Sequence, residues 1–490
     1  MTEDKLIQER IDKLGKIREL GVDPYPYTYD HKHHSTDILD KYHQLKVGED
    51  DKKAKLSVAG RILLKRDMGK AAFVTIRDQK GDLQLYFRKD DIGEESYKLF
   101  KLLDLGDIIG VTGHIFKTKR GELTIYVKEL SLLTKSLRPL PEKFHGLKDD
   151  EIRYRHRELD LIMNPDTRET LRKRSLILKY IRDFMEEKGF LEMTTPILQT
   201  VYGGANARPF VTQINAWDMP MYLKISPELF LKRLVVGGFE KVYDMNYNFR
   251  NEGVDKTHNP EFYMLEFYQA YADREKVMEL TEELWKYVAV KLLDTTEVKY
   301  GDTILSLKRP WKRYTMKDAI KEFGKIDVDK LSDEELFDLR ITYNIDVEGD
   351  LNRGMMIELL FEELVEDKLI QPTHILDHPI ESTPLCKPTK YSDEHVERVE
   401  PYMMGWEIGN GYSELTDPIL QRKLMDLQVE RGRGGDEEAH PMDEDFMQAI
   451  ETGLPPAGGM GVGVERMIMI LTGAETIRDV LPFPIMKPEQ

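Results

Sequence analysis

Two predicted strands near the middle of the chain each carry chemically useful side chains on one face. Over residues 241–250, polar and apolar residues alternate, and the polar face comprises Asp244, Asn246, Asn248 and Arg250. Over residues 261–270, one face comprises Phe262, Met264, Glu266 and Tyr268. A guanidinium group suits phosphate, an aromatic ring stacks on a flat ring, and a carboxylate with a phenol pairs with a cation. The pattern predicts a site for a ligand with all three features, with a solvated hairpin bearing surface salt bridges as the alternative.

A second polar strand face is expected near residue 410. It carries Asn410, Tyr412 and Glu414, and Glu400 and Glu407 precede it. Two carboxylates beside bound phosphates form a natural Mg²⁺ site, because this ion combines a few carboxylates with substrate oxygens. The chain holds 89 Asp plus Glu residues, however, so carboxylate spacing by itself does not single out a metal site.

A glycine-rich segment, residues 458–463, precedes Arg466 and an apolar helix near the C-terminus. Glycine lets the backbone approach a ligand closely, and an arginine at a helix start can bind phosphate. The segment lacks the lysine of a P-loop and the strand–helix–strand setting of a dinucleotide fingerprint. On its own, the pattern is not specific for a nucleotide site.

The elements that must position these residues begin with a small β domain. Short alternating strands separated by glycine-containing turns are predicted at 57–64, 71–77, 82–87, 108–116 and 123–132. Five strands in about 80 residues favour a small closed barrel of the oligonucleotide-binding type. Strand parity places Ala72, Val74, Ile76, Leu83, Leu85 and Phe87 in the core. Phe73, Gln84 and Tyr86 then face outward, and an exposed ring beside an amide suits a splayed RNA base; a plain surface hydrophobe is the alternative for Phe73.

The chain is expected to contain an N-terminal helical arm, residues 1–55, the barrel domain, residues 56–140, and a large domain, residues 150–490. The large domain mixes strands with long helices, including one with Ile177, Tyr180, Ile181 and Phe184 on one face and Gly189 at its end. Residues 315–370 form a mostly helical insertion between two strand-rich halves. These predictions together give an α+β fold.

Composition favours a protein of the cytoplasm. No apolar run approaches the roughly 20 residues that span a bilayer, and the first residues are too polar for a signal peptide. The single cysteine, Cys386, excludes internal disulfides and is expected to be a small packed side chain. The net charge is −17, but residues 1–150 hold 29 Lys plus Arg against 26 Asp plus Glu, so RNA binding by this part remains open.

Taken together, these segments resemble the three signature motifs of class II aminoacyl-tRNA synthetases, in order and with long literal identity. The motifs correspond to residues 188–197, to 249–252 with 258–262, and to 461–466. Residues 203–210, 227–234 and 410–415 resemble phrases of the lysyl subgroup. The resemblance covers nearly the whole chain. It implies an antiparallel catalytic sheet flanked by helices, preceded by an anticodon-binding barrel, in a homodimer formed around the first motif.

The resemblance also implies roles for individual residues. For ATP it implies Arg250 on the α-phosphate, Arg466 on the γ-phosphate, adenine between Phe262 and Arg466, and Glu252 and His258 in the same site. For lysine it implies Glu228 and the Gly204 backbone at the α-amino group, Tyr268 and Glu414 at the ε-ammonium group, and Glu266, Asn410 and Tyr412 beside them. Mg²⁺ would be bound by Glu400 and Glu407, and the central anticodon uridine by Phe73 and Gln84.

The implied reaction is the ATP-dependent activation of L-lysine and its transfer to tRNA-Lys, which needs no protein nucleophile or catalytic base. Gln213 and Ile214 depart from paired histidines usual in the family, Tyr247 from an arginine, and Trp406 is also unusual. Three rivals remain: an aspartyl or asparaginyl enzyme, a ligase that attaches lysine to a protein, and a non-catalytic RNA-binding paralogue.

Overall fold

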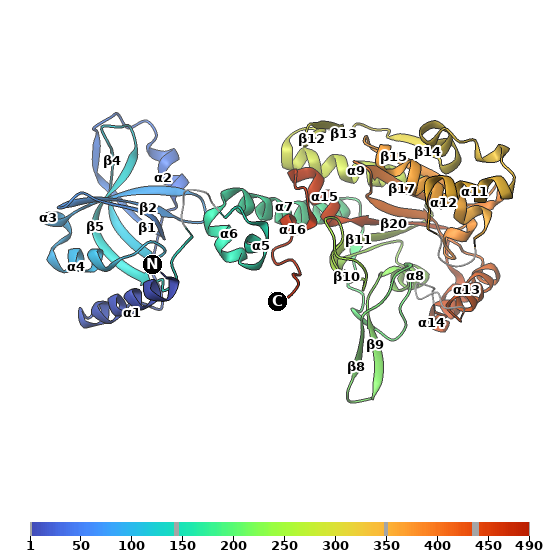
Figure 1. Ribbon diagram of the computed structural model, residues 1–490, viewed down its shortest axis with the longest axis horizontal. Helices are drawn as coiled ribbons and strands as arrows, with labels where there is room; N and C mark the ends of the chain where they lie inside the picture. The colour runs from blue at the N-terminus through green and yellow to red at the C-terminus, as the bar shows by residue number, and fades with distance from the viewer. Residues whose placement is uncertain (1, 142–146, 347–350, 434–440, 490) are drawn as a thin grey trace. The chain divides into compact units, whose positions relative to one another are not determined.

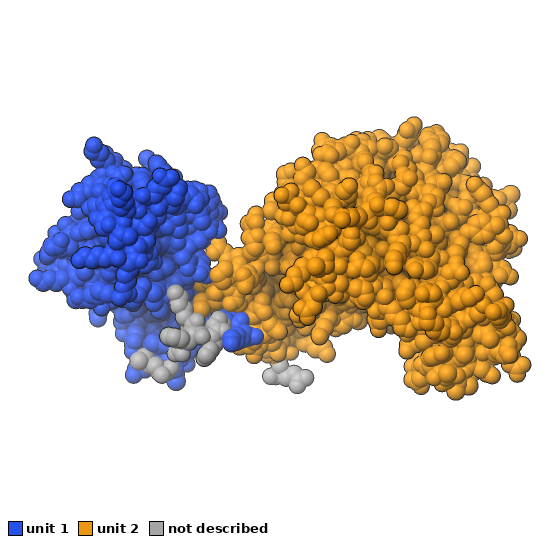
Figure 2. Space-filling view, turned by 90° about the horizontal axis from the view of Figure 1, so that it is seen from above, with its two compact units in different colours: residues 1–148 blue, residues 149–490 orange. Residues whose placement is uncertain are grey.

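A computed structural model describes residues 2–141, 147–346, 351–433 and 441–489. The chain divides into two compact units, Met1–Lys148 and Asp149–Gln490, which Figure 2 distinguishes by colour. Within the described ranges, no helix is both long enough and apolar enough to cross a membrane.

The first unit is built around a closed five-stranded barrel. Its strands are β1 (Asp50–Asp67), β2 (Ala71–Arg77), β3 (Asp82–Arg88), β4 (Ile108–Lys117) and β5 (Leu123–Thr134), joined in the order β1-β2-β3-β5-β4. The five predicted strands are confirmed, and β1 begins earlier than predicted. Four helices accompany the barrel: α1 (Glu3–Glu19), α2 (Ser35–Tyr42), α3 (Lys89–Ile92) and α4 (Glu94–Leu102). Ile17 of α1 and Ile38 of α2 are buried in the same hydrophobic cluster as the barrel interior, so these helices belong to its core.

The second unit contains a large, mainly antiparallel sheet (Figure 1). Its strands in spatial order are β14 (Lys312–Thr315), β15 (Thr373–Pro379), β17 (Ser392–Met403), β19 (Gly409–Ser413), β20 (Ala457–Gly463), β11 (Glu261–Ala270), β10 (Lys241–Phe249) and β6 (Leu191–Glu192). Two further short strands, β16 (Pro388–Thr389) and β18 (Trp406–Glu407), also pair with β17 but stand outside this strand order. The β14–β15 and β10–β6 pairs are parallel.

One face of the sheet packs against helices and forms the main core. The helices are α7 (Pro165–Glu187), α9 (Arg274–Leu293) and α15 (Val464–Thr472), and they share a hydrophobic cluster with Leu265, Phe267, Met460 and Val462 of the sheet. Glu266 and Tyr268 alternate with Leu265 and Phe267 along β11. Because successive side chains of a strand point to opposite faces, Glu266 and Tyr268 point away from the core helices. The predicted parity of residues 241–250 and 261–270 is thereby confirmed.

Shorter elements complete the second unit. The remaining helices outside the insertion are α5 (Asp150–Arg155), α6 (Arg157–Met163), α8 (Glu228–Val236), α13 (Pro418–Arg433), α14 (Glu444–Gly453), α16 (Ile477–Val480) and the 3-10 turn η4 (Ile380–Ser382). A three-stranded sheet is formed by β7 (Leu198–Gln199), β9 (Met219–Leu223) and β8 (Val211–Ile214), and a hairpin by β12 (Glu297–Tyr300) and β13 (Thr303–Ser306).

Short helical elements lie between β14 and β15, where a helical insertion was predicted. The insertion comprises α10 (Met316–Ala319), η1 (Ile320–Gly324), η2 (Val328–Lys330), α11 (Asp333–Tyr343), α12 (Arg353–Leu364) and η3 (Glu366–Lys368), and residues 347–350 lie outside the described residues. Its side chains share a hydrophobic cluster with Ile375 and Tyr402 of the large sheet. The insertion therefore extends one end of the sheet's core.

Candidate active site

A cavity of about 390 Å³ opens on the face of the large sheet that the core helices leave free. That volume lies in the range of small-molecule binding sites. Most of the predicted ligand-binding residues line it: Gly204, Glu228, Arg250, Glu252, His258, Phe262, Glu266, Tyr268, Glu407, Asn410, Tyr412 and Arg466. Glu400 and Glu414 are not among the lining residues, although both lie close to it.

The register of three strands explains how these side chains meet. Gly461 of β20 pairs with Glu266 of β11 on one side and with Asn410 of β19 on the other. Gly459 stands in the same way between Tyr268 and Tyr412. A β-carbon on Gly459 would clash with the Tyr268 ring and lie 2.8 Å from Glu414 Oε1. The glycine-rich segment is thus a strand that leaves room for its neighbours' side chains.

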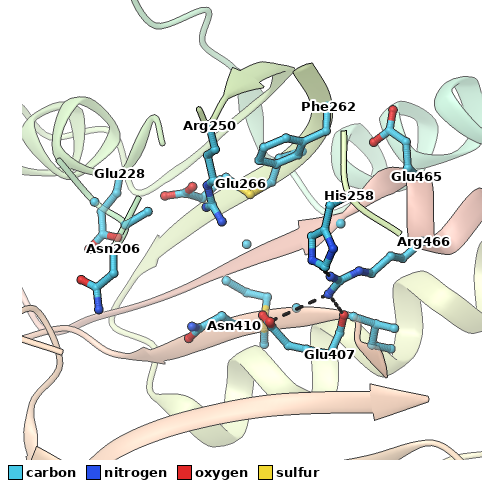
Figure 3. A pocket seen from close by; sticks show the side chains of 18 of the residues that line it. Asn206, Glu228, Arg250, His258, Phe262, Glu266, Glu407, Asn410, Glu465 and Arg466 are labelled. Atoms are coloured by element: carbon cyan, nitrogen blue, oxygen red, sulfur yellow. Dashed lines mark hydrogen bonds and ion pairs between the residues drawn. The ribbon is translucent and has the colours of Figure 1, made fainter. Parts of the chain in front are cut away.

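Arg250 and Arg466 both line the cavity (Figure 3). The Arg250 guanidinium lies 5.2 Å from the centre of the Phe262 ring, and its buried Nε has no hydrogen-bond partner among the described residues. Burial lowers the pKa of Arg250 from its usual value. Arg466 Nη2 lies 3.3 Å from His258 Nε2, and Arg466 also bonds to the main-chain oxygen of Glu407. Two guanidinium groups beside an exposed ring face fit an anionic ligand that carries a flat ring.

Glu400 and Glu407 form the candidate cation site. Glu407 lines the cavity, and burial together with the neighbouring Glu400 raises its pKa. The Glu400 carboxylate accepts hydrogen bonds from Arg398, Tyr402 and Asn410. No group of three or more His, Cys, Asp or Glu side chains in the described part of the chain is arranged to hold a metal. Two mutually repelling carboxylates fit a divalent ion that takes its other ligands from phosphate oxygens.

The part of the cavity around Glu228 and Glu266 is acidic. Glu266 is 4% exposed and accepts hydrogen bonds from the Tyr268 hydroxyl at 2.7 Å and from the Ser226 hydroxyl at 3.0 Å. Burial, reinforced by the charge of Glu228, raises the pKa of Glu266 to about 8. Among the described residues, no cation lies within 4.0 Å of this carboxylate. A buried carboxylate that holds only hydroxyl donors is suited to a cationic ligand.

Glu414 lies beside the cavity but is not one of its lining residues. β19 ends at Ser413, and Glu414 lies 2.5 Å from the buried ammonium group of Lys232 instead of lining the cavity. Lys232 also lies 2.5 Å from Glu228 Oε1, which accepts a hydrogen bond from the Tyr412 hydroxyl at 2.5 Å. Burial raises the pKa of Glu414 to about 8. The Glu414 carboxylate still lies on the side of the sheet that Tyr412 and Tyr268 share, because a β-carbon on Gly459, between these two residues, would lie 2.8 Å from Glu414 Oε1.

Gly204 approaches this acidic part of the cavity closely. Its φ of +85° lies in the region that favours glycine, and a β-carbon there would lie 2.7 Å from Ser226 Oγ and 2.8 Å from Glu228 Cβ. The backbone at Gly204 therefore forms part of the cavity wall next to Glu228.

Several lining residues were not predicted. Arg398, Asn206 and Ser226 lie at or beside the cavity, and Lys232 lies behind it. Strand parity could have found Arg398, because it precedes Glu400 by two residues in β17 and shares its face. The helical spacing of Glu228 and Lys232 was a signal for their ion pair.

The candidate RNA-binding residues lie on the barrel of the first unit. Phe73 faces outward, and the centre of its ring lies 5.0 Å from that of Tyr86. The Tyr86 ring in turn contacts the rings of Phe116 and Tyr126. Gln84 was predicted to face outward beside Phe73; it is 6% exposed, and its Nε2 donates to Thr124 Oγ1. β3 lies between β2 and β5, so Thr75 and Thr124 flank Gln84.

Comparison with known proteins agrees with this architecture. Residues 149–487 match the family described as tRNA synthetases class II (D, K and N), and residues 56–133 match the OB-fold nucleic acid binding domain. The chain belongs to the class II tRNA synthetases of the D, K and N group.

Within that group, the relatives share nearly the full length of the chain. A lysine–tRNA ligase of Carboxydothermus hydrogenoformans is 49% identical over 486 residues, which cover 99% of this chain and 98% of the relative. The lysine–tRNA ligases of Syntrophomonas wolfei and Clostridium novyi are 47% and 48% identical to this chain. The matched residues cover 99% of this chain in both cases, and 97% and 94% of the two relatives.

Proposed function

We propose that the protein is a lysine–tRNA ligase. It activates L-lysine with ATP and transfers the lysyl group to the 3′ end of tRNA-Lys. Membership of the synthetase family and the activity for which the full-length relatives are named support this function. The observation that carries the choice of lysine is Glu266, a buried carboxylate in the cavity with hydroxyl donors but no cation within 4.0 Å among the described residues.

The cavity fits lysine better than the substrates of the related aspartyl and asparaginyl enzymes. Those substrates need a cation or amide donors for a side-chain carboxylate or amide. Glu228 and Glu266 instead offer carboxylates, and an unpaired buried carboxylate strongly disfavours a neutral or acidic side chain. Glu266 with Tyr268 receives the ε-ammonium group, and Glu228 with the Gly204 backbone receives the α-ammonium group. Asn410 and Tyr412 line the same pocket, and Glu414 supports it from behind.

In the first step, a lysine carboxylate oxygen forms a bond to the α-phosphorus, the bond to the β-phosphate bridge breaks, and pyrophosphate leaves. Arg250 holds the α-phosphate, Arg466 holds the γ-phosphate, and Phe262 stacks on adenine, with Glu252 and His258 in the same site. Glu400 and Glu407 would hold Mg²⁺, which neutralises phosphate charge when bound. In the second step, the terminal hydroxyl of tRNA attacks the lysyl carbonyl carbon, and AMP leaves.

The proposal extends to the partners of the chain. Phe73 stacks on an anticodon base, and Gln84 contributes its amide after exchanging its bond to Thr124. A homodimer would cover exposed apolar residues near the first motif, namely Leu191, Leu198, Val211 and Trp217, which are 46% to 73% exposed. The cytoplasm is the proposed location, because the charged tRNA is used there.

The test is amino-acid-dependent exchange of labelled pyrophosphate into ATP, with Mg²⁺ and each of the twenty amino acids separately. Exchange with lysine alone, followed by charging of tRNA-Lys, is the expected result. Exchange with aspartate or asparagine would favour the related enzymes, and no exchange with any amino acid would favour a non-catalytic paralogue.

A further inference from the structure

Lys232 lies behind the wall of the cavity where the ammonium groups of the substrate are proposed to bind. Its side chain is 1% exposed, and Nζ lies 2.5 Å from both Glu228 Oε1 and Glu414 Oε2. Nζ also lies 5.3 to 5.9 Å from the ring centres of Tyr412, Tyr268 and Phe446. Lys232 therefore occupies a cage of carboxylates and aromatic rings, the kind of surroundings that bind an ammonium ligand.

The charges around this cage do not balance. Glu228, Glu266 and Glu414 are three carboxylates, each 4% exposed or less. Within the described residues, Lys232 is the cation in ion-pair distance of Glu228 and Glu414, and none lies so close to Glu266. With these four groups charged, their net charge is −2, and Arg250, the lining cation that also feels the charge of Glu266, is not within ion-pair distance of it among the described residues. A diamino acid brings two ammonium groups, whereas most amino acids bring one.

Lys232 also fixes which carboxylate oxygen is left for a ligand. Its contact with Glu228 is to Oε1, and the Tyr412 hydroxyl donates to the same oxygen. Glu228 lines the cavity while Lys232 does not, so Glu228 Oε2 is the oxygen left for the cavity. A buried ion pair by itself is weak evidence for a stabilising role, because apolar side chains of similar volume often serve stability as well.

We propose that Lys232 is a specificity-determining positioning residue that acts as a built-in ammonium group. It neutralises one of three buried carboxylates and holds Glu228 in place, so that the unmatched charge of the pocket equals the two ammonium groups of a diamino acid. This inference rests on the proposed lysine-activating function.

The test uses the full-length chain and the pyrophosphate-exchange assay, with lysine and ATP varied separately. Lys232→Met removes the charge but keeps an apolar stem. Lys232→Ala leaves a space that n-propylammonium, which has the size and charge of the lost atoms, can fill, and 1-propanol serves as the uncharged probe. Arg233→Met is the matched control, because Arg233 is the next residue of α8 and its side chain is 36% exposed. Thermal unfolding of each variant is recorded with and without lysine.

The expected result is a rise in the KM for lysine of about a hundredfold or more in Lys232→Met and Lys232→Ala, from the loss of a buried counter-charge. The KM for ATP should stay within about threefold, as should both constants of Arg233→Met. n-Propylammonium should restore most of the lysine affinity of Lys232→Ala, whereas 1-propanol should not.

Three results would overturn the inference. One is a folded Lys232→Met variant with unchanged KM for lysine. Another is equal rescue by n-propylammonium and 1-propanol, which would show that Lys232 only fills space. If either variant does not fold, the affinity of Lys232→Arg for lysine is measured instead. Near-normal lysine affinity of Lys232→Arg supports a role of the charge. The third overturning result is a loss of lysine affinity in Lys232→Arg equal to that of an unrelated destabilised variant. Absence of lysine-dependent exchange in the unaltered chain would instead refute the proposed function.

Discussion

The carboxylate of Glu266 offers the sharpest test of how the site selects its substrate. Glu266→Gln removes the negative charge but keeps the shape of the side chain, and the hydroxyls of Tyr268 and Ser226 can rotate to keep their hydrogen bonds. Two unit charges about 4 Å apart attract by about 4 kcal/mol at an effective dielectric constant near 20. Part of that energy is retained through the neutral amide, so the expected loss is about 2 to 4 kcal/mol. This corresponds to a fall in kcat/KM for lysine of roughly thirtyfold to a thousandfold.

The assay is pyrophosphate exchange at fixed saturating ATP with lysine varied. Glu261→Gln is the matched control, because Glu261 is an exposed acid at the start of the same strand. The KM for ATP should not change in either variant. A fall in kcat/KM of less than threefold for Glu266→Gln, or an equal fall for Glu261→Gln, would refute the assignment of Glu266 to the ammonium group.

The same carboxylates make lysine binding depend on pH. Glu266 and Glu414 have pKa values raised to about 8, so below that pH a proton must leave before an ammonium group binds. As the pH rises from 6 to 8, the KM for lysine should therefore fall, by up to about tenfold per pH unit for each proton that lysine displaces. The free energy of unfolding of the unliganded protein should fall as the pH rises through 8, because the folded protein then loses its extra bound protons. Glu266→Gln should flatten the profile, and a KM independent of pH would contradict the raised pKa values. Phe73→Ala should raise the KM for tRNA by about tenfold, through loss of base stacking, while leaving pyrophosphate exchange unchanged; a change in exchange instead would place Phe73 outside tRNA binding. Gly459→Ala should lower the melting temperature and weaken lysine binding by displacing the Tyr268 ring, and normal values of both would show that the ring moves freely.

Periodicity predicted the framework of the protein well. The barrel strands and the faces of residues 241–250 and 261–270 follow from alternation, because one face of each strand must be buried. The three motifs then predicted which faces carry the candidate ligand-binding residues, and most of these residues line one cavity. A sheet in which β20 pairs with both β11 and β19 brings these distant segments together.

Individual side chains escaped prediction where a neighbour distant in sequence decides their state. Gln84 is 6% exposed and bonds to Thr124 of β5, and Glu414 pairs with the buried Lys232 of α8. Arg398 was overlooked although its parity was available. Pairings across elements depend on tertiary distances, which alternation along a single strand does not contain.

The glycines of β20 affect more than the space for Tyr268 and Glu266. Gly459 and Gly461 form the part of the cavity wall that β20 contributes, and they have no side chains. This part of the wall therefore cannot adapt to a ligand of different length by a change of rotamer. In the proposed function, a diamino acid one methylene shorter than lysine would leave its ammonium group short of Glu266, and Gly459 and Gly461 have no side chain that could move in to close the gap. The length of the substrate is therefore measured against backbone, the least adjustable part of the protein.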